Sequence, residues 1–322
     1  MMRSRGAALA IQRPLKDVVI ATLSAAAILL VFSTLVFLAL RLLPGDPTAM
    51  ILGDESTAAD RLQLARKLGF DKPLAVQYGR FVAGLTHLDL GASLSHPEQS
   101  AFSCVASALK NTAWLAFIAV ALGAAGGVGA ALLCVGPWMG RHATTVHGVV
   151  LLVAAVPMLA LAPLATWVLA VKLAVVPLPG DPDHELPGLF FAASLLALPL
   201  GAQVARIGRV ALLEQRQALF LHTARAKGAS SWRVWCVHAL PVAAGPILVV
   251  LASQLGALLG GAVVLERFFE RPGLGTLMLE AYVARDIPVL EAAIVAAGLL
   301  FVTVQVLATG LTVLVDPRGQ KV

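Results

Sequence analysis

Six stretches of the chain contain no Asp, Glu, Lys or Arg, and this pattern constrains the fold more than any other feature. They cover residues 18–40, 111–140, 142–171, 186–205, 234–265 and 292–315. A helix needs about 20 apolar residues to cross the hydrocarbon core of a bilayer, and every stretch reaches that length. We therefore expect an all-α, polytopic membrane protein with six transmembrane helices.

The composition excludes the alternative of a soluble protein. Only 13% of the 322 residues are charged, and the mean hydropathy is +0.86. A soluble domain carries about 25% charged residues, so this chain could not cover a water-facing surface. The three cysteines, Cys104, Cys134 and Cys236, are far apart without CxxC spacing, which indicates neither a zinc site nor a disulfide framework. We expect no metal site and no catalytic residue.

The distribution of basic residues predicts the orientation. With the N-terminus in the cytoplasm, the inner segments hold thirteen Lys and Arg residues and the two short outer loops hold four. Basic residues accumulate in cytoplasmic loops, so both termini are expected there. The net charge of +6 then reflects topology, and we expect no nucleic-acid partner.

This orientation divides the chain into five parts. We expect a cytoplasmic N-terminal tail (1–17), a retained first transmembrane helix (18–40) and an outer helical segment (41–110). A five-helix membrane core (111–315) with a cytoplasmic loop (206–238) follows, and then a cytoplasmic tail (316–322). The first stretch is too long and uniform for the core of a signal peptide.

Two helices are predicted in the outer segment. Thr57 and Asp60 form a capping box, and the following apolar stripe ends at Gly69. A second helix starts at Pro73 and places an apolar stripe on one face, which we expect to pack onto the membrane domain. The stripe consists of Leu74, Tyr78, Phe81, Val82 and Leu85.

The cytoplasmic loop has helical periodicity on both sides of a glycine. It predicts a helix, a sharp turn at Gly228, and a second helix that Ser230 and Ser231 cap. Glycine suits such a turn because a Cβ would meet closely approaching backbone. The loop is far longer than the reversal at Arg141 requires, which suggests a docking surface for a partner.

These motifs resemble the permeases of binding-protein-dependent ABC importers. His222-Thr223-Ala224, Gly228 and Leu240-Pro241 fit the spacing of that family's "EAA" loop. Other motifs are similar to the dipeptide and oligopeptide permease B subunits, and together they cover nearly the whole chain. They are residues 43–47 (LPGDP), 68–73 (LGFDKP), 89–91 (DLG), 223–228 (TARAKG), 272–275 (PGLG), 285–286 (RD) and 316–318 (DPR).

The resemblance implies a type I ABC importer permease fold and a transport function, with peptides as the expected cargo. Such a subunit forms half of the translocation path and couples to separate ATPase subunits through the elbow, here residues 221–232. The implied coupling residues are His222, Thr223, Ala224, Arg225, Ala226, Lys227 and Gly228. The implied location is the bacterial inner membrane.

The resemblance also implies the partners. They are a homologous second permease, two ABC ATPases, an extracytoplasmic substrate-binding protein and the surrounding lipid. The chain has no GxxxxGK[ST] loop, so we expect no cofactor here and ATP bound by the partner subunits. His222, Leu219 and Pro241-Val242 depart from the family pattern at the elbow.

Polar residues within the apolar stretches are the candidates for the translocation path, because a polar side chain that faces lipid is costly. They are Gln203, Ser253, Gln254 and Gln305, together with Thr303 and Glu291. Hydrogen bonds between helices are the alternative explanation for each. Gly256 and Gly260 have the spacing of a small-residue helix interface.

Two other classes of function remain as alternatives. A secondary transporter or channel without an ATPase is disfavoured by the scarcity of ionisable residues in the spans. An intramembrane enzyme is disfavoured by the lack of an HExxH or GxSxG motif. The cargo stays open between dipeptides, oligopeptides, nickel, glutathione and some sugars.

Overall fold

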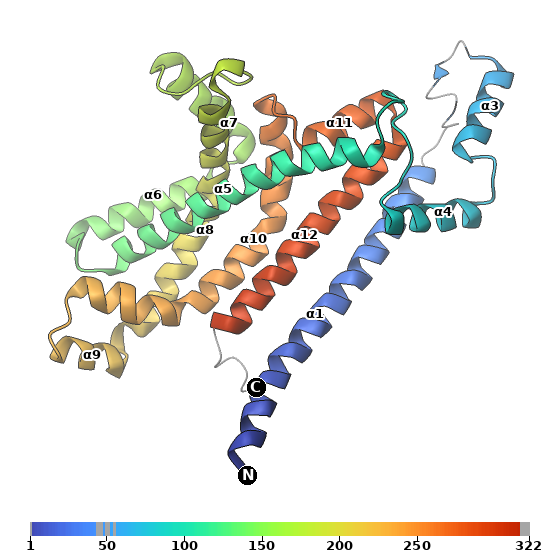
Figure 1. Ribbon diagram of the computed structural model, residues 1–322. Helices are drawn as coiled ribbons and strands as arrows, with labels where there is room; N and C mark the ends of the chain where they lie inside the picture. Colours follow the sequence, from blue (N-terminus) through green and yellow to red (C-terminus); the bar gives the residue numbers. More distant parts are fainter. Residues whose placement is uncertain (1, 43–47, 49–51, 54–55, 316–322) are drawn as a thin grey trace. The chain divides into compact units, whose positions relative to one another are not determined.

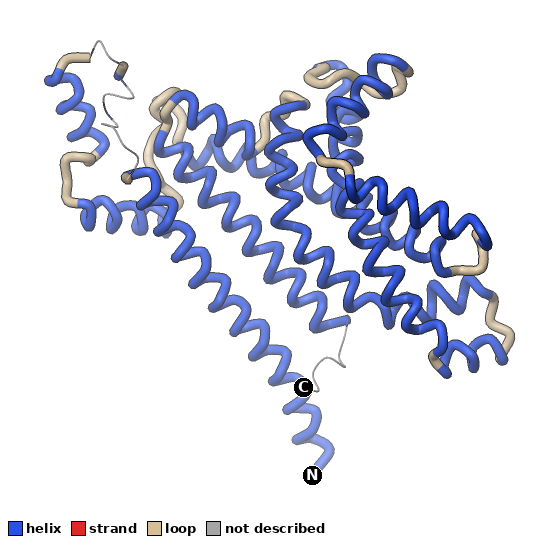
Figure 2. Tube along the Cα trace, turned by 180° about the vertical axis from the view of Figure 1, so that it is seen from behind, coloured by secondary structure: helices blue, strands red, loops and turns tan. Residues whose placement is uncertain are grey.

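The computed structural model describes residues 2–42, 48, 52–53 and 56–315, and these residues are almost entirely helical. Figure 1 shows the helices in chain order, and Figure 2 shows helices joined by loops, with no strand in the described residues. The prediction of an all-α fold is confirmed.

Eleven long or medium helices and five short ones make up the described residues. The α-helices are α1 (Met2–Arg41), α3 (Ala58–Leu68), α4 (Leu74–His87), α5 (Ala101–Val135), α6 (Ala143–Ala155), α7 (Met158–Thr166), α8 (Glu185–Glu214), α9 (Leu219–Ala226), α10 (Leu240–Phe268), α11 (Leu274–Ala284) and α12 (Ile287–Val315). The short elements are the 3-10 helices η1 (Gly140–His142), η3 (Pro182–His184) and η4 (Gln215–Gln217), and the π-helices η2 (Trp167–Lys172) and η5 (Arg233–Ala239).

Five helical segments in the described residues are long and apolar enough to cross a membrane. They are Thr22–Arg41, Ala101–Val135, Pro182–Gln217, Arg233–Gln254 and Ile287–Leu307. A sixth span is formed only if the bent pair Gly140–Ala155 and Met158–Lys172 is counted as one. The chain is thus a multi-pass membrane protein.

The third predicted span is not one straight helix. Its two halves meet at an angle of 106°. Proline disfavours the helical conformation in the residue before it, and Val156 is accordingly extended (φ −79°, ψ 122°). Pro157 is extended as well and α7 begins at Met158, so the expectation of a single helix over 142–171 was wrong.

The first helix extends beyond its apolar span. The chain is helical from Met2, whereas the candidate span covers Thr22–Arg41, so the segment 2–17 expected as a tail is helical and continuous with α1. The expected tail at 316–322 and the LPGDP motif at 43–47 lie outside the described residues.

By its internal contacts the chain divides into two compact units. Residues 1–25, 113–270 and 301–322 belong to the first unit, and residues 26–112 and 271–300 belong to the second. Each unit is described by itself below.

The second unit contains the two predicted outer helices. At α3, Thr57 and Asp60 form a capping box, and Gly69 ends the helix in the left-handed conformation (φ 75°), as predicted. Most of the stripe on α4 packs inward, since Phe81 is buried with Phe37 of α1 and Val295 of α12, whereas Leu74 is exposed. The hydroxyl groups of Tyr78 and Thr34 lie 2.8 Å apart.

Two buried acidic residues join separate segments of the second unit. Asp286 lies directly before α12, is only 2% exposed, and accepts hydrogen bonds from the segment 93–95. Glu291, in the first turns of α12, forms an ion pair with Arg41 at the end of α1. Arg41 also donates to the amide oxygen of Gln77 on α4 over 3.3 Å, so this cluster joins three helices.

Helix α8 is the centre of the first unit. In the most apolar part of the span Pro182–Gln217, which contains α8, 56% of the residues are buried. The corresponding share is 28% for the span Arg233–Gln254, which contains the start of α10. Phe191, Leu195 and Leu196 of α8 pack against Leu258 and Leu265 of α10. The other helices of this unit leave more of their apolar surface open, as lipid-facing or partner-facing helices do.

Helices α5 and α8 meet through glycines. An added Cβ at Gly127 would lie 2.5 Å from the carbonyl oxygen of Gly201, and one at Gly123 would lie 2.8 Å from Cδ2 of Leu200. Gly123 and Gly127 have the small-xxx-small spacing that permits close helix packing. The predicted glycine interface at 256 and 260 is not tested, because the packing around these two glycines is not among the described features.

Candidate functional site

The elbow is the most distinctive element outside the apolar windows. In the structure we use "elbow" for a wider segment than the predicted 221–232, namely residues 215–232, which comprise η4, α9 and the turn that follows (Figure 1, lower left). Helix α8 runs without interruption to Glu214, beyond the predicted end of the span at residue 205. The chain then becomes extended at Ala218 (ψ 132°), which separates α9 from α8.

Gly228 ends α9 in a Schellman motif. Its N–H donates to the carbonyl oxygen of Arg225 over 2.9 Å, and the N–H of Ala229 donates to that of Ala224 over 3.1 Å. Gly228 has a φ of +79°, which a side chain disfavours. The expected steric reason was wrong, because an added Cβ at Gly228 would meet nothing within 4 Å. The backbone conformation requires the glycine.

A serine begins the return helix, as the sequence predicts. The hydroxyl oxygen of Ser230 accepts from the N–H of Arg233 over 3.4 Å, and its carbonyl oxygen accepts from Val234 over 2.9 Å. Ser231 is already helical. The cap is therefore Ser230, and the sharp reversal predicted for this loop is confirmed.

A buried apolar cluster fixes the inner face of the elbow. Leu221 of α9 is fully buried and packs in one cluster with Leu132 of α5 and Leu212 of α8. Val234 and Trp235 of η5 complete the cluster and are at most 4% exposed. The elbow is thus attached to the ends of two long helices rather than hanging as a free loop.

The outer face of the elbow is open and combines apolar with basic side chains. Leu219 is 83% exposed and Trp232 is 64% exposed. Of the predicted coupling residues, Ala224 is half-buried and His222, Thr223, Arg225, Ala226, Lys227 and Gly228 are exposed. Within the described part of the chain, no ion pair engages Arg225 or Lys227. Such a surface can receive a partner that offers an apolar pocket with an acidic rim.

The sequence missed two features of this surface. Leu219 was noted only as a departure from a family pattern, yet it is the most exposed large apolar side chain in the described residues. Trp138 contacts Trp232 from the loop between α5 and α6, with ring centroids 5.9 Å apart. A tryptophan within the turn sequence Gly136-Pro137-Trp138-Met139 could have signalled that contact.

The predicted path residues are distributed over three helices of the first unit. Gln203 of α8 is half-buried and accepts from Arg206 over 3.2 Å. Ser253 of α10 is exposed and donates to the carbonyl oxygen of Val250 in its own helix over 2.9 Å, and Gln254 and Gln305 are half-buried. Glu291 is buried in the second unit in its ion pair with Arg41, which supports the alternative explanation of a bond between helices for that residue.

Two family models match this chain. The "Binding-protein-dependent transport system inner membrane component" model matches residues 123–321, which include the elbow, and the corresponding N-terminal model matches residues 15–119. The chain belongs to this family of ABC importer permeases. The elbow of this permease therefore lies within the matched region.

Curated relatives support the assignment over almost the full length of the permease. A Brucella abortus protein whose name describes a peptide transport system permease is 36% identical over 300 residues, covering 90% of this chain and 94% of the relative. The glutathione transport system permease protein GsiC of Salmonella paratyphi A is 32% identical over 298 residues, with the same coverage. A GsiC protein of Escherichia coli is also 32% identical over 298 residues.

Proposed function

We propose that this permease imports peptides as one half of a translocation path, and that separate ATPase subunits drive it by docking on the elbow. The observation that carries this proposal is the elbow itself. Its inner face is held by the buried Leu221, and its outer face leaves Leu219 83% exposed. Phe220 (42%) and Trp232 (64%) are exposed as well, and neighbouring exposed apolar side chains of this kind mark surfaces that a partner protein covers.

Charge supports the same partner surface. Arg216, Arg225, Lys227 and Arg233 are all exposed on or beside the elbow. An acidic rim on the partner would steer the two surfaces together. ATP binds to the partner subunits in this proposal, and this chain hydrolyses nothing.

The proposal includes the other subunits and the orientation. A homologous second permease completes the path, two ATPases dock on the cytoplasmic side, and an extracytoplasmic binding protein delivers the substrate. The bias of basic residues supports an inner-membrane protein with both termini in the cytoplasm.

The path is proposed to include Gln203, Ser253, Gln254 and Gln305. Exposed polar groups such as Ser253 are costly against lipid, so a second permease that covers them would relieve that cost. Peptides are the proposed cargo because the relatives' names describe peptide and glutathione transport.

Affinity purification of the tagged chain from its native membranes tests the proposal. We expect two ATPase subunits and a second permease to co-purify, and we expect Leu219→Asp to lose the ATPase while it retains the second permease. The control is Leu62→Asp on α3, where another exposed leucine (53%) lies outside the candidate spans. A chain that purifies alone and still transports labelled tri-alanine in proteoliposomes would support a secondary transporter or channel instead.

A further inference from the structure

The loop between α5 and α6 folds a tryptophan back onto its own backbone. Gly136 follows α5 directly and is buried. An added Cβ there would lie 2.0 Å from Cζ3 of Trp138 and 2.2 Å from its Cε3. The indole therefore lies against the Cα of Gly136, and any larger residue at 136 would displace it.

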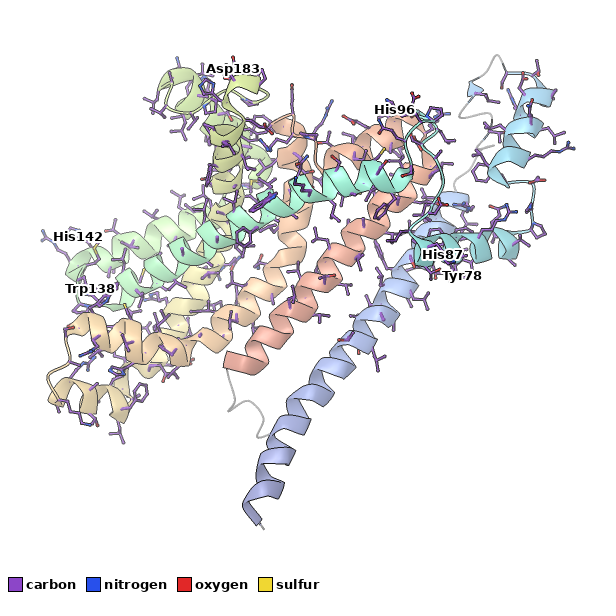
Figure 3. All side chains as sticks on the ribbon, in the orientation of Figure 1. Tyr78, His87, His96, Trp138, His142 and Asp183 are labelled. Carbon is purple, nitrogen blue, oxygen red and sulfur yellow. The ribbon has the colours of Figure 1, made fainter. Side chains whose placement is uncertain are left out.

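The position of this indole brings it to the elbow. Trp138 contacts Trp232, with ring centroids 5.9 Å apart and ring planes inclined at 58°. Trp232 directly precedes η5 and follows the turn at Gly228. Figure 3 shows Trp138 on the loop after α5, on the side where the segment around α9 lies.

This contact contributes little to burying apolar surface. Trp138 is still 39% exposed and Trp232 is 64% exposed, and neither ring belongs to the buried cluster under α9. The two rings therefore connect the α5–α6 loop with the end of the elbow outside the buried apolar cluster.

The link adds to the attachments of the elbow. The buried cluster joins Leu221 of α9 to α5 and α8, and it includes Val234 and Trp235 of η5, so it holds the chain on both sides of the turn at Gly228. The contact between Trp138 and Trp232 attaches the elbow to the α5–α6 loop as well.

We propose that Trp138 is a positioning residue for the docking elbow. Together with Trp232 it joins the elbow to the α5–α6 loop, so that an ATPase pulling on α9 moves this loop and α6 together with α5, α8 and α10. This inference rests on the proposed function, because it assumes that an ATPase docks on the elbow.

The test measures coupling in the complete importer, purified from its host and reconstituted in proteoliposomes. Trp138→Ala should lower the uptake of labelled tri-alanine per ATP hydrolysed by about threefold or more, with the amount of co-purified ATPase unchanged. Trp138→Phe keeps an aromatic ring and should restore most of that ratio. The matched control is Trp114→Ala, because Trp114 is also exposed (54%) and also pairs with a ring, that of Phe117, on α5.

A double variant shows whether the two indoles act together. Trp138→Ala combined with Trp232→Ala should lower the ratio no further than Trp138→Ala alone. An unchanged ratio in Trp138→Ala, or an equal loss in Trp138→Phe or Trp114→Ala, would overturn the inference while the docking proposal stands. If no ATPase co-purifies with the wild-type chain, both fall together.

Crosslinking provides a second measurement, in which a covalent bridge replaces the two aromatic rings. Trp138→Cys and Trp232→Cys are introduced after Cys104, Cys134 and Cys236 have been replaced by alanine, and a short bismaleimide joins them. Since the loop and the elbow are proposed to move together, the crosslink should raise uptake per ATP above that of the uncrosslinked double-cysteine variant. Uptake that stops on crosslinking would contradict the proposal.

Discussion

The hydroxyl of Ser93 donates a hydrogen bond to the buried carboxylate of Asp286, although 193 positions separate the two residues in the chain. The same carboxylate oxygen accepts from the N–H groups of Leu94, at 2.9 Å, and Ser95, at 3.0 Å. One acid thus holds an outer loop against the start of α12 within the second unit.

Replacing this acid should release the loop. Asp286→Ala leaves the buried hydroxyl of Ser93 and two backbone N–H groups without their acceptor, and we expect a loss of about 2–4 kcal/mol of stability. Limited proteolysis should then cut within residues 88–100 in detergent-solubilised protein. Asp89→Ala is the control, because Asp89 is exposed and accepts only from the nearby N–H of Gly91. Equal cleavage of the two variants would contradict the assigned role of Asp286.

The ion pair between Arg41 and Glu291 should behave as a buried pair. Their side chains are 17% and 7% exposed. Glu291→Leu alone leaves an uncompensated cation and should cost about 3–5 kcal/mol. Arg41→Met combined with Glu291→Leu should recover part of that loss, because no charge is then left buried. Thermal unfolding of the purified variants measures this, and additive losses would argue against the pair.

The contact between α5 and α8 predicts a difference between neighbouring glycines. Gly127→Ala places a Cβ only 2.5 Å from the carbonyl oxygen of Gly201, so the helices must separate, at a cost of about 1–3 kcal/mol. Gly126→Ala is the matched control, since a Cβ there meets nothing within 4 Å. The unfolding temperature should fall for Gly127→Ala alone. A similar fall in both variants would mean that α5 and α8 are not in this contact.

The glycine that ends α9 should tolerate residues according to their backbone preference rather than their size. Gly228→Asn should retain most transport because asparagine accepts the left-handed conformation, whereas Gly228→Val should strain the turn by about 1–3 kcal/mol. Gly228→Asp accepts the same conformation but adds a negative charge that faces the proposed acidic rim of the ATPase, so we expect ATP hydrolysis without uptake, with normal membrane insertion. Uptake by the reconstituted importer checks all three, and full uptake in Gly228→Val would remove the turn from the coupling mechanism.

The capping box of α3 should make its first turn sensitive to acid. The hydroxyl and the N–H of Thr57 donate to the carboxylate of Asp60, and they hold the pKa of Asp60 below its ordinary value. A carboxylate whose pKa is lowered in the folded state contributes its full stabilisation above the ordinary Asp pKa of about 3.9. That contribution is lost as the pH falls through the lowered pKa. Hydrogen exchange in the peptide covering residues 56–70, corrected for the intrinsic rate, should therefore accelerate below about pH 4. Thr57→Val should show little of this pH dependence.

Features with local causes could be predicted from the sequence. The capping box at Thr57, the helix end at Gly69 and the turn at Gly228 each follow from residues within one or two turns of the backbone. The length of the apolar stretches likewise predicted the candidate spans, because length and polarity are properties of a segment alone.

The break in the third apolar stretch could not be predicted from its proline alone. Pro163, Pro199 and Pro246 lie inside helices that continue, whereas the chain becomes extended at Pro157. Whether a helix bends or breaks at proline depends on what neighbouring helices offer to the freed backbone groups. That information is not contained in the segment.

Contacts between residues that are far apart in the chain could not be predicted from the sequence for the same reason. Spacing alone does not show which helix Gly123 and Gly127 contact, and the structure places α8 there. Composition likewise does not show that Trp138 meets Trp232 or that Ser93 meets Asp286. The coupling role of the elbow is a prediction that the proposed experiments address, and the path residues stay predictions.

The uninterrupted course of α8 has a mechanical consequence. Its 30 residues make a rod about 45 Å long, since each residue adds about 1.5 Å. A lever of that length that tilts by about 5° at one end moves its other end by about 4 Å, the size of a side chain. Pro199, near its midpoint, lacks the N–H that would bond to the preceding turn. Helix α8 can therefore bend at Pro199. This position is next to Leu200, whose side chain packs against Gly123 of α5.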